Sequence, residues 1–283
     1  VLQHYDVTPY ISGSTRAKLT KAQAEKIEIP VPPLGVQQRI AVILDKADAI
    51  RRKRREALAE IDALLRSAYQ SLVSARHPNF PKWKPKTFEE LAAQHKGSMR
   101  TGPFGSDLRH SEFVDEGIAV LGIDNAVSNR FAWGGRRYIT PEKYDGLRRY
   151  RAYPGDVIVT IMGTTGRSAV VPDDIPEAIT TKHLATITLD RHLALPEFVA
   201  FAIHSDPRIV NQITRANKGA IMDGLNLGII KHLEIALPPI EDQDRFARVY
   251  RKLNAHKARL EMPEVNGDEL FNSLAQRAFQ GEL

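Results

Sequence analysis

The sequence predicts an α+β protein in which one mixed α/β domain is joined to two long helices. Three observations lead to this prediction. A short segment that starts a helix occurs twice, far apart in the chain. Each occurrence is followed by apolar residues at alternating steps of three and four, the spacing of a helix that packs along one face. The residues between the two helices are rich in glycine and short apolar runs, which are typical of strands and turns.

The repeated segment is a Pro-Pro helix start. Glu28–Leu34 returns as Glu234–Ile240, at an offset of 206 residues (238 minus 32). Matches at this offset extend to both sides: Gly13 and Gly219, Leu19 and Leu225, Gln37 and Gln243, Arg39 and Arg245, Ala41 and Ala247. A later match pairs Ala68-Tyr69-Gln70 with Ala278-Phe279-Gln280. Solenoid repeats have periods of ~20–50 residues, so this pattern indicates a duplicated module, with one copy nearly whole and the other present as its tail.

The first long helix is predicted over about 36–75, a stretch without proline or internal glycine. Its apolar seam consists of Ile40, Leu44, Ala47, Leu58, Ile61, Leu65, Ala68 and Leu72. Arg51 and Arg54 occupy two seam positions, where each must pair with a carboxylate or leave the seam. So long an amphipathic helix needs a partner helix to cover its stripe.

Residues 82–235 predict a compact domain of mixed structure. Strands are expected at 118–123, 157–162, 169–171 and 184–189, and short helices with proline in the first turn at 196–203 and 207–213. A second long helix follows Pro238-Pro239 and repeats the seam with Phe246, Leu253 and Phe279. Pro263 lies inside it, and because proline costs a helix interior ~3 kcal/mol, a kink or loop is expected there.

Composition narrows the functional classes. The chain has 40 basic and 34 acidic residues and no cysteine, which excludes disulfides and Cys-ligated zinc and fits a reducing cytoplasm. No apolar run approaches the ~18 residues of a membrane span, and the first residues are polar and mixed rather than a signal peptide. The net charge of +6 favours a polyanionic partner. The chain starts with Val1, so we expect a fragment or a shortened protein.

Basic and aromatic residues alternate between 130 and 151, where seven Arg or Lys residues accompany Trp133 and several tyrosines. Such a mixture suits a surface that follows phosphates, although a solvated surface is equally compatible with it. Arg and Lys also read guanine, and Asn reads adenine. The candidates from this region are Asn125, Arg130, Arg136 and Arg137. The run Arg51–Arg55 is either a solvated helix face or a contact to phosphate or a partner.

A loop after one predicted strand, a loop before another and one basic loop add further candidates. Met162–Arg167 is too short and lacks the lysine of a P-loop, so it is interpreted as a tight turn. Thr180–His183 receives the same interpretation, and Arg215–Gly219 is a basic loop just before the repeated tail. The candidates from these loops are Thr164, Thr165, Arg167, Lys182, Asn217 and Lys218. Each loop is also compatible with a purely structural turn.

Known catalytic patterns are missing from the sequence. The Pro-Pro pairs follow Val31 and Leu237 rather than Asn or Asp, so they do not form an adenine-methyltransferase motif. Pro172-Asp173 has no downstream acidic-x-Lys partner of a nuclease, and the nine histidines show no metal-ligand spacing. We therefore expect no catalytic residue and no metal site in this chain.

The repeated helix start, the terminal Ala278–Leu283 segment, and the Gly102–Ser106 and Tyr153–Ile158 segments resemble the DNA-specificity subunits of Type I restriction–modification systems. The resemblance spans the whole chain. It implies target-recognition domains that each precede a conserved spacer helix, with the two helices paired as an antiparallel coiled coil. The expected domains are 1–34, a C-terminal remnant of a first target-recognition domain; 35–77, a spacer helix; 78–239, a complete target-recognition domain; and 240–283, a second spacer helix. The resemblance also implies that the Met162–Arg167 turn lies on the DNA-facing edge, where Thr164, Thr165 and Arg167 can bond phosphate. Arg100 and Ser106 join the DNA-contacting candidates on the same basis.

The resemblance also implies a function and partners. We expect a non-catalytic subunit that binds double-stranded DNA and directs methyltransferase and restriction subunits to a bipartite site. S-adenosylmethionine, ATP and Mg²⁺ would belong to those partners, and a second copy of the chain is a further possible partner. The seam residues would form the helix pairing or partner surface. The alternatives are a stand-alone DNA-binding regulator, an enzyme whose site escapes these patterns, and a remnant that no longer assembles.

Overall fold

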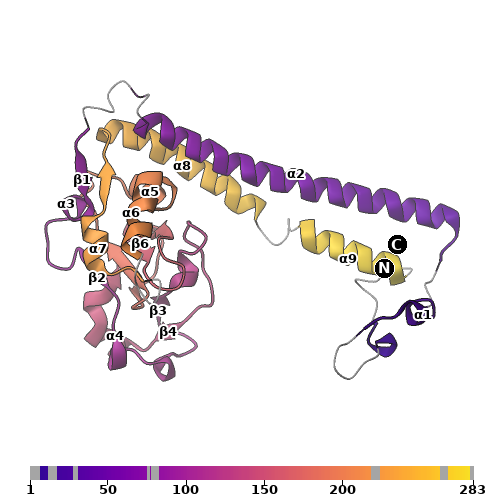
Figure 1. The fold of residues 1–283 in the computed structure, drawn as a ribbon. Coiled ribbons are helices and arrows are strands. Elements are labelled where there is room, and N and C mark those ends of the chain that lie inside the picture. Colours follow the sequence, from indigo (N-terminus) through magenta and orange to yellow (C-terminus); the bar gives the residue numbers. More distant parts are fainter. Residues whose placement is uncertain are drawn as a thin grey trace. The chain divides into compact units, whose positions relative to one another are not determined.

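The computed structural model describes residues 7–11, 18–27, 31–74, 77, 83–217, 224–261 and 267–280 (Figure 1). The chain divides into two compact units, Val1–Asp62 with Asn254–Leu283, and Ala63–Leu253. The first unit contains the short η1 (Thr8–Tyr10) and α1 (Lys21–Ala24) and the larger part of α2 (Leu34–Val73). It also contains the end of α8 (Ile240–Leu260) and all of α9 (Gly267–Gln280).

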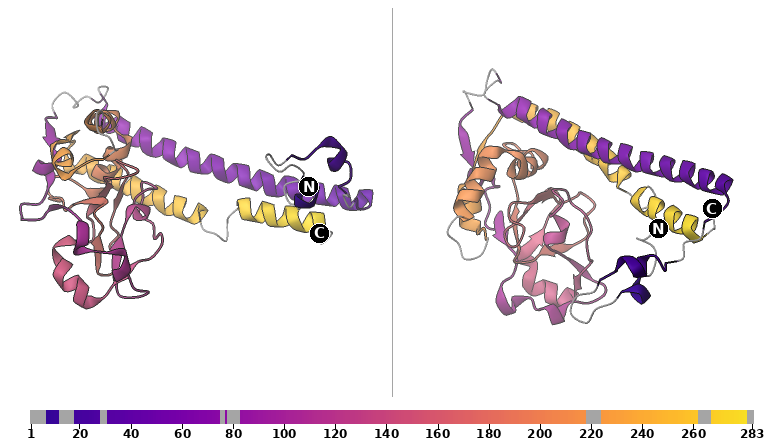
Figure 2. Two further views of the ribbon diagram at one scale, coloured as in Figure 1. Left: turned by 60° about the horizontal axis from the view of Figure 1, so that its bottom comes forward. Right: turned by 45° about the vertical axis from the view of Figure 1, so that its right-hand side comes forward.

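The helices of the first unit pair in opposite directions. Lys257 of α8 forms an ion pair with Asp62 of α2, with Nζ 2.7 Å from Oδ1. The guanidinium of Arg51 lies 4.6 Å from the ring centroid of Phe271 in α9. Residue numbers on α2 fall while those of their partners rise, so the pairing is antiparallel, as Figure 2 shows for α2 and α9. The predicted antiparallel helix pair is therefore confirmed.

The predicted seam is the buried side of α2. In the first unit Ala47 and Ile61 are 4% and 5% exposed, whereas Val42 and Ile50, off the seam, are each 53% exposed. Arg51 stays in the seam because it forms an ion pair with Asp48, one of the two outcomes predicted for it. Helix α8 ends at Leu260 and α9 begins at Gly267; Pro263 lies outside the described residues, as does the side chain of Phe279.

The second unit is built around two four-stranded sheets. The first has the order β2-β9-β6-β7, with all pairs antiparallel: β2 (Met99–Thr101), β9 (Leu184–Ile187), β6 (Val157–Thr160), β7 (Ser168–Val170). The second has the order β4-β3-β8-β5: β4 (Tyr138–Ile139), β3 (Ile118–Leu121), β8 (Ala178–Thr180), β5 (Arg151–Ala152). Only the β3–β8 pair of this sheet is parallel. A small antiparallel pair joins β1 (Pro85–Thr87) to β10 (Glu234–Ala236).

Short helices complete this unit. They are α3 (Phe88–Leu91), α4 (Pro141–Leu147), α5 (Pro196–Ser205), α6 (Pro207–Asn217) and α7 (Leu227–His232), with 3-10 turns η3 (Gly105–Asp107), η4 (His110–Glu112), η5 (Ile123–Asn125) and η6 (Arg148–Tyr150). The predicted strands and both proline-started helices are present. The strand predicted over 118–123 stops at Leu121, because Gly122 starts the η5 turn, where its N–H donates to Asn125.

Tyr69 anchors the last turns of α2 to this domain. Its ring packs against Phe198 and Phe201 of α5 and Phe246 of α8, with centroids 5.2 to 5.8 Å away. Its hydroxyl donates to Asp206, at 2.9 Å. Tyr69 is 1% exposed, and burial together with the charge of Asp206 raises the pKa of its phenol well above the usual value. The aromatic packing and this buried hydrogen bond fix α2 to α5 and α8.

The two Pro-Pro helix starts form the same hydrogen bond. Nε2 of Gln37 donates to the Pro32 carbonyl at 2.7 Å, and Nε2 of Gln243 donates to the Pro238 carbonyl at 2.8 Å. Gln243 is fully buried and also accepts from the N–H of Leu195, the N-cap residue of α5. Gln37 is exposed. The repeat therefore has a structural basis, and only its second copy is covered by a domain among the described residues.

Candidate nucleic-acid interface

The carboxyl ends of the two parallel strands meet at one edge of the second sheet. Strand β3 runs into Gly122 and η5, and β8 runs into Thr181, whose N–H donates to the Leu121 carbonyl at 2.8 Å. Arg137 immediately precedes β4, and its carbonyl accepts from Val120. In open sheets, ligands commonly bind beyond the carboxyl ends of parallel strands, so a ligand site is expected at this edge.

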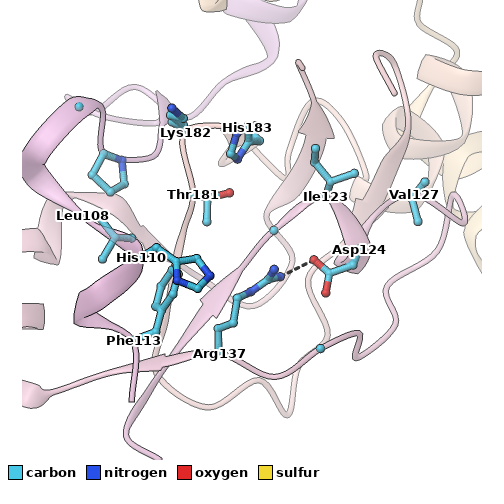
Figure 3. A pocket seen from close by; sticks show the side chains of 14 residues that line it. Leu108, His110, Phe113, Ile123, Asp124, Val127, Arg137, Thr181, Lys182 and His183 are labelled. Carbon is cyan, nitrogen blue, oxygen red and sulfur yellow. Dashed lines mark hydrogen bonds and ion pairs between the residues drawn. The ribbon is translucent and has the colours of Figure 1, made fainter. Parts of the chain in front are cut away.

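A pocket of about 740 Å³ opens there. Figure 3 shows its side chains gathered around one hollow, with Arg137 and Asp124 joined by an ion pair. Loops from three parts of the chain contribute to its wall: Pro103, Gly105, Leu108, His110, Phe113, Gly122, Ile123, Asp124, Val127, Gly135, Arg137, Thr181, Lys182 and His183. The pocket thus brings together the predicted candidates Arg137 and Lys182, which are 45 positions apart in the chain.

Gly102 explains why the Gly102–Ser106 segment reaches this pocket. A Cβ at this position would lie 2.1 Å from the Thr180 carbonyl oxygen and 2.3 Å from the Thr181 carbonyl carbon. Both are backbone atoms that cannot give way, so only glycine permits the close approach. The approach places Pro103 and Gly105 on the pocket wall and leaves Ser106, a predicted contact residue, exposed at the surface.

The charge around the pocket is mostly positive. Asp124 is neutralised by Arg137, while Lys182 is exposed and forms no ion pair with the residues that the structure describes. Burial, reinforced by the charges of Lys182 and Arg137, lowers the pKa of His183 below its usual value. A neutral imidazole offers one hydrogen-bond donor and one acceptor. The pocket therefore combines cations at its edge with uncharged polar groups in its wall.

The basic and aromatic residues between 130 and 151 stack on one another, but most of the charge is internally compensated. Arg136 lies 5.2 Å from the Trp133 ring centroid and Arg149 lies 4.7 Å from that of Tyr150. Five of the seven cations pair with carboxylates: Arg137–Asp124, Lys143–Glu112, Arg148–Asp145, Arg149–Asp107 and Arg151–Glu177. Arg136 is exposed and forms no ion pair within the described part of the chain.

The turn between β6 and β7 lies beside the pocket. A Cβ on Gly163 would be 3.7 Å from Ile123 of the pocket wall, and one on Gly166 would be 3.4 Å from Ile213 of α6. Both glycines have positive φ, 74° and 79°. The turn thus places Thr164 and Arg167 at the surface, with Thr165 half-buried between pocket and α6. Arg167 also has no ion pair among the described residues. Lys218 and the side chain of Asn217 lie outside those residues.

The candidates Arg100 and Asn125 have hydrogen-bond partners inside the domain. Arg100 is 8% exposed; it forms an ion pair with Asp156 and donates to the carbonyls of Arg151 and Gly97. Asn125, 3% exposed, accepts from Gly122 and donates to the Ala132 carbonyl. The polar groups of both side chains are engaged inside the domain, so we leave Arg100 and Asn125 out of the proposed DNA contacts. Arg130 is half-buried, and its carbonyl accepts from Ser128.

The pocket residues His110, Phe113 and Asp124 were not predicted from the sequence, because they come from segments without a periodic pattern. Thr181 belongs to the predicted Thr180–His183 segment but was not named as a candidate by itself. No cluster of three or more possible metal ligands occurs in the described ranges, and no helix within them is long and apolar enough to cross a membrane.

The fold and this site define a class: a chain that combines a domain of mixed helices and strands, with a cation-edged loop surface, and an antiparallel helix pair. The predicted resemblance to Type I specificity subunits is confirmed by comparison with known proteins. The family model described as the Type I restriction modification DNA specificity domain matches residues 2–61. The EcoBI specificity subunit of Escherichia coli is 23% identical over 294 residues, covering 96% of this chain and 62% of that protein.

Further comparisons agree. A putative Type I specificity subunit of Haemophilus influenzae, S.HindORF215P, is 25% identical over 258 residues, covering 89% of this chain and 63% of that protein. The S subunit structure from M. genitalium superimposes with a TM-score of 0.60 at 14% identity, covering 96% of this chain and 68% of that chain. The HsdS subunit structure from Thermoanaerobacter tengcongensis superimposes with a TM-score of 0.50 at 19% identity, covering 98% of this chain and 68% of that chain. The chain thus has this fold and spans about three fifths of the length of the two curated relatives.

Proposed function

We propose that the chain is a non-catalytic DNA-recognition subunit of a Type I restriction–modification complex, and that its α/β domain binds one half of a bipartite site. The DNA would lie on what we term the loop face, formed by residues 102–106, 122–137, 162–167 and 181–183. The observation that carries the proposal is the charge on this face. Three exposed cations, Arg136, Arg167 and Lys182, have no carboxylate partner among the described residues, while the neighbouring cations are paired.

Unpaired exposed cations are the ones that gain most from meeting phosphate, because no internal ion pair has to be broken. Ser106, Thr164 and Thr165 lie on the same face and add hydroxyl donors, which position a protein on the DNA backbone. Arg137 lines the pocket, and Arg137 and Arg130 are the candidates for reading base edges. Arg215, near the end of α6, is exposed, and Asn217 and Lys218 belong to the proposed set on the sequence alone.

The helix pair would set the distance between recognition domains and dock the methyltransferase subunits. In this proposal residues 1–34 are the tail of another target-recognition domain, 35–77 and 240–283 are spacer helices, and 78–239 is the complete domain. The shared Gln–Pro hydrogen bond supports this division, since both helix starts follow the same kind of segment. A second copy of the chain, or a longer form of it, would supply the other half-site. S-adenosylmethionine, ATP and Mg²⁺ would be bound by the partners.

Quantitative DNA binding tests the proposal. The half-site is first selected from random duplexes with the purified chain and its methyltransferase partner, and affinity is then measured against salt. Each lost phosphate contact lowers the slope of log K against log salt by ~0.9. Over a fourfold change in salt, that difference amounts to roughly 3.5-fold in affinity. We expect this change for Arg136→Ala and for Lys182→Ala.

Arg148→Ala is the matched control, because Arg148 is equally exposed in the same cluster but is paired with Asp145. It should leave the slope unchanged. If the slope is unaltered in both the Arg136 and the Lys182 variants, the DNA does not bind on the loop face. Methylome sequencing of cells with and without the gene separates the alternatives: a stand-alone regulator or a decayed remnant leaves the methylation pattern unchanged.

A further inference from the structure

We propose that the pocket on the loop face receives one base of the bound DNA, turned out of the helical stack, and that Phe104 fills the space it leaves. This inference rests on the proposed DNA-recognition function and adds a binding site for a nucleobase. Removing a base from the stack has an energetic cost that depends on the sequence, so the step would contribute to sequence recognition as well as to binding.

The pocket has the size and the wall of a small-molecule site. Its volume of about 740 Å³ falls within the ~300–1,000 Å³ of typical ligand pockets. His110 and Phe113 form part of the wall with their rings edge to face at 5.5 Å, and Leu108 adds an aliphatic surface. Aromatic and aliphatic side chains are the surfaces on which extruded bases stack. Figure 3 shows these residues on one side of the hollow and Ile123 and Val127 on the other.

Two polar atoms on this wall lack partners. Oγ1 of Thr181 and Nε of Arg137 are buried and form no hydrogen bond in the described structure. Buried polar atoms are nearly always hydrogen-bonded, so each such atom calls for an explanation. Both residues line the same pocket, next to the imidazole of His183. A nucleobase edge carries donors and acceptors side by side and would satisfy a hydroxyl, an N–H and a neutral imidazole together.

Phe104 is placed to take the position of the displaced base. Its side chain is 50% exposed, although its chain neighbours Pro103 and Gly105 both line the pocket. The segment is held against β8 by the close approach of Gly102, so Phe104 projects from a fixed loop. Apolar side chains inserted between base steps are a known means of unstacking and kinking a duplex. Lys182 lies on the same rim and can hold the adjacent phosphate.

An abasic scan of the selected half-site tests the inference with the full chain and its partner. Each nucleotide is replaced in turn by an abasic one, and affinity is measured. At an ordinary contacted position, losing the base weakens binding. At the position extruded into this pocket binding should be retained or become tighter, on the order of tenfold, because the unstacking cost disappears; the adenine that the methyltransferase partner itself extrudes is left out of the comparison. 2-Aminopurine at that same position should increase in fluorescence when the protein binds.

Variants connect this signal to the pocket. Phe104→Ala should abolish the fluorescence increase while Phe104→Leu, which keeps an apolar wedge, retains it. Thr181→Val keeps the shape of the side chain but removes the hydroxyl, and it should weaken the binding of intact DNA more than the binding of abasic DNA. Leu193 is an exposed apolar residue outside the loop face. Leu193→Ala is therefore the control and should change neither the fluorescence increase nor the affinity.

Two outcomes would overturn the inference. One is normal, salt-dependent half-site binding in which every abasic position weakens affinity; the proposed function would then stand without base extrusion. The other is calorimetric binding of free AMP by the chain without DNA, combined with no abasic gain, which would assign the pocket to a free nucleotide. Failure to bind any selected half-site is a different result, because it refutes the proposed function itself.

Discussion

Replacing Tyr69 by Phe isolates the hydrogen bond that holds α2 to the α/β domain. The substitution removes only the hydroxyl that donates to Asp206, at 2.9 Å. The ring remains and keeps its contacts with Phe198 and Phe201. Asp206 keeps its ion pair with Arg208, so no buried charge is left alone. The change in stability therefore reports one charged hydrogen bond and little else.

The expected size follows from the surroundings. A hydrogen bond to a charged group contributes ~1.5–3 kcal/mol, and here Asp206 retains other donors, which reduces the loss. We expect Tyr69→Phe to lower the free energy of unfolding by about 1–2 kcal/mol at pH 7. Tyr153→Phe, at an exposed tyrosine, should change it by less than about 0.5 kcal/mol and is the matched control.

The pH dependence gives a sharper test. The folded-state pKa of Tyr69 is raised above its unfolded value, so above pH ~10 the unfolded chain releases the proton while the folded chain holds it. The contribution of Tyr69 to the free energy of unfolding is therefore fully present below pH ~10 and decreases at higher pH by ~1.4 kcal/mol per pH unit. The phenylalanine variant lacks this decrease, so the two stability curves should meet near pH ~11.

Urea unfolding followed by circular dichroism between pH 7 and 11 measures both effects, and the absence of cysteine removes thiol ionisation from the analysis. A stability difference between wild type and Tyr69→Phe that stays constant from pH 9 to 11 would refute the assigned burial of the phenol. A difference near zero at pH 7 would refute the hydrogen bond.

Three further substitutions test the packing. Asp156→Ala leaves its buried arginine partner without a counter-charge, and urea unfolding should show a loss of about 3–5 kcal/mol. Gln243→Ala removes a buried side chain with three hydrogen bonds and should cost roughly 2–3 kcal/mol, whereas Gln37→Ala, at the exposed repeat position, should cost under about 0.5. Equal costs would contradict the different burial of the two copies. Gly102→Ala should unfold or distort the pocket, because its Cβ meets backbone, whereas a Cβ at Gly146, outside the loop face, meets nothing within 4 Å, so Gly146→Ala should preserve DNA binding.

The long helices and most strands could be predicted because their patterns are local. The steps of three and four along α2 and the alternation around β6 depend on nearby residues only. The roles of single polar residues were less accessible. The ion pair of Arg100 with Asp156, 56 positions away, could not be predicted, because sequence does not show that β2 and β6 both pair with β9. The burial of Asn125 could not be predicted from the sequence either.

The basic cluster shows the same limit. Its charge was visible in the sequence, but much of its neutralisation comes from Asp107, Glu112 and Glu177, which lie outside the cluster and reach it through the fold. Glycines at 102, 163 and 166 marked turns, yet the surfaces that these turns meet are set by tertiary packing. What remained predictable was the general location of the site: loops that follow apolar runs.

The matched hydrogen bonds at the two Pro-Pro helix starts suggest two equivalent points at which domains could be exchanged. Gln37 and Gln243 hold the preceding proline carbonyl at the same five-residue spacing, so the start of each long helix is stabilised in the same way by its own sequence. We therefore expect that a chain cut before one helix start can be joined before the other with this hydrogen bond intact. If the proposed function is correct, grafting a foreign α/β domain between these two points should change the DNA sequence that is recognised.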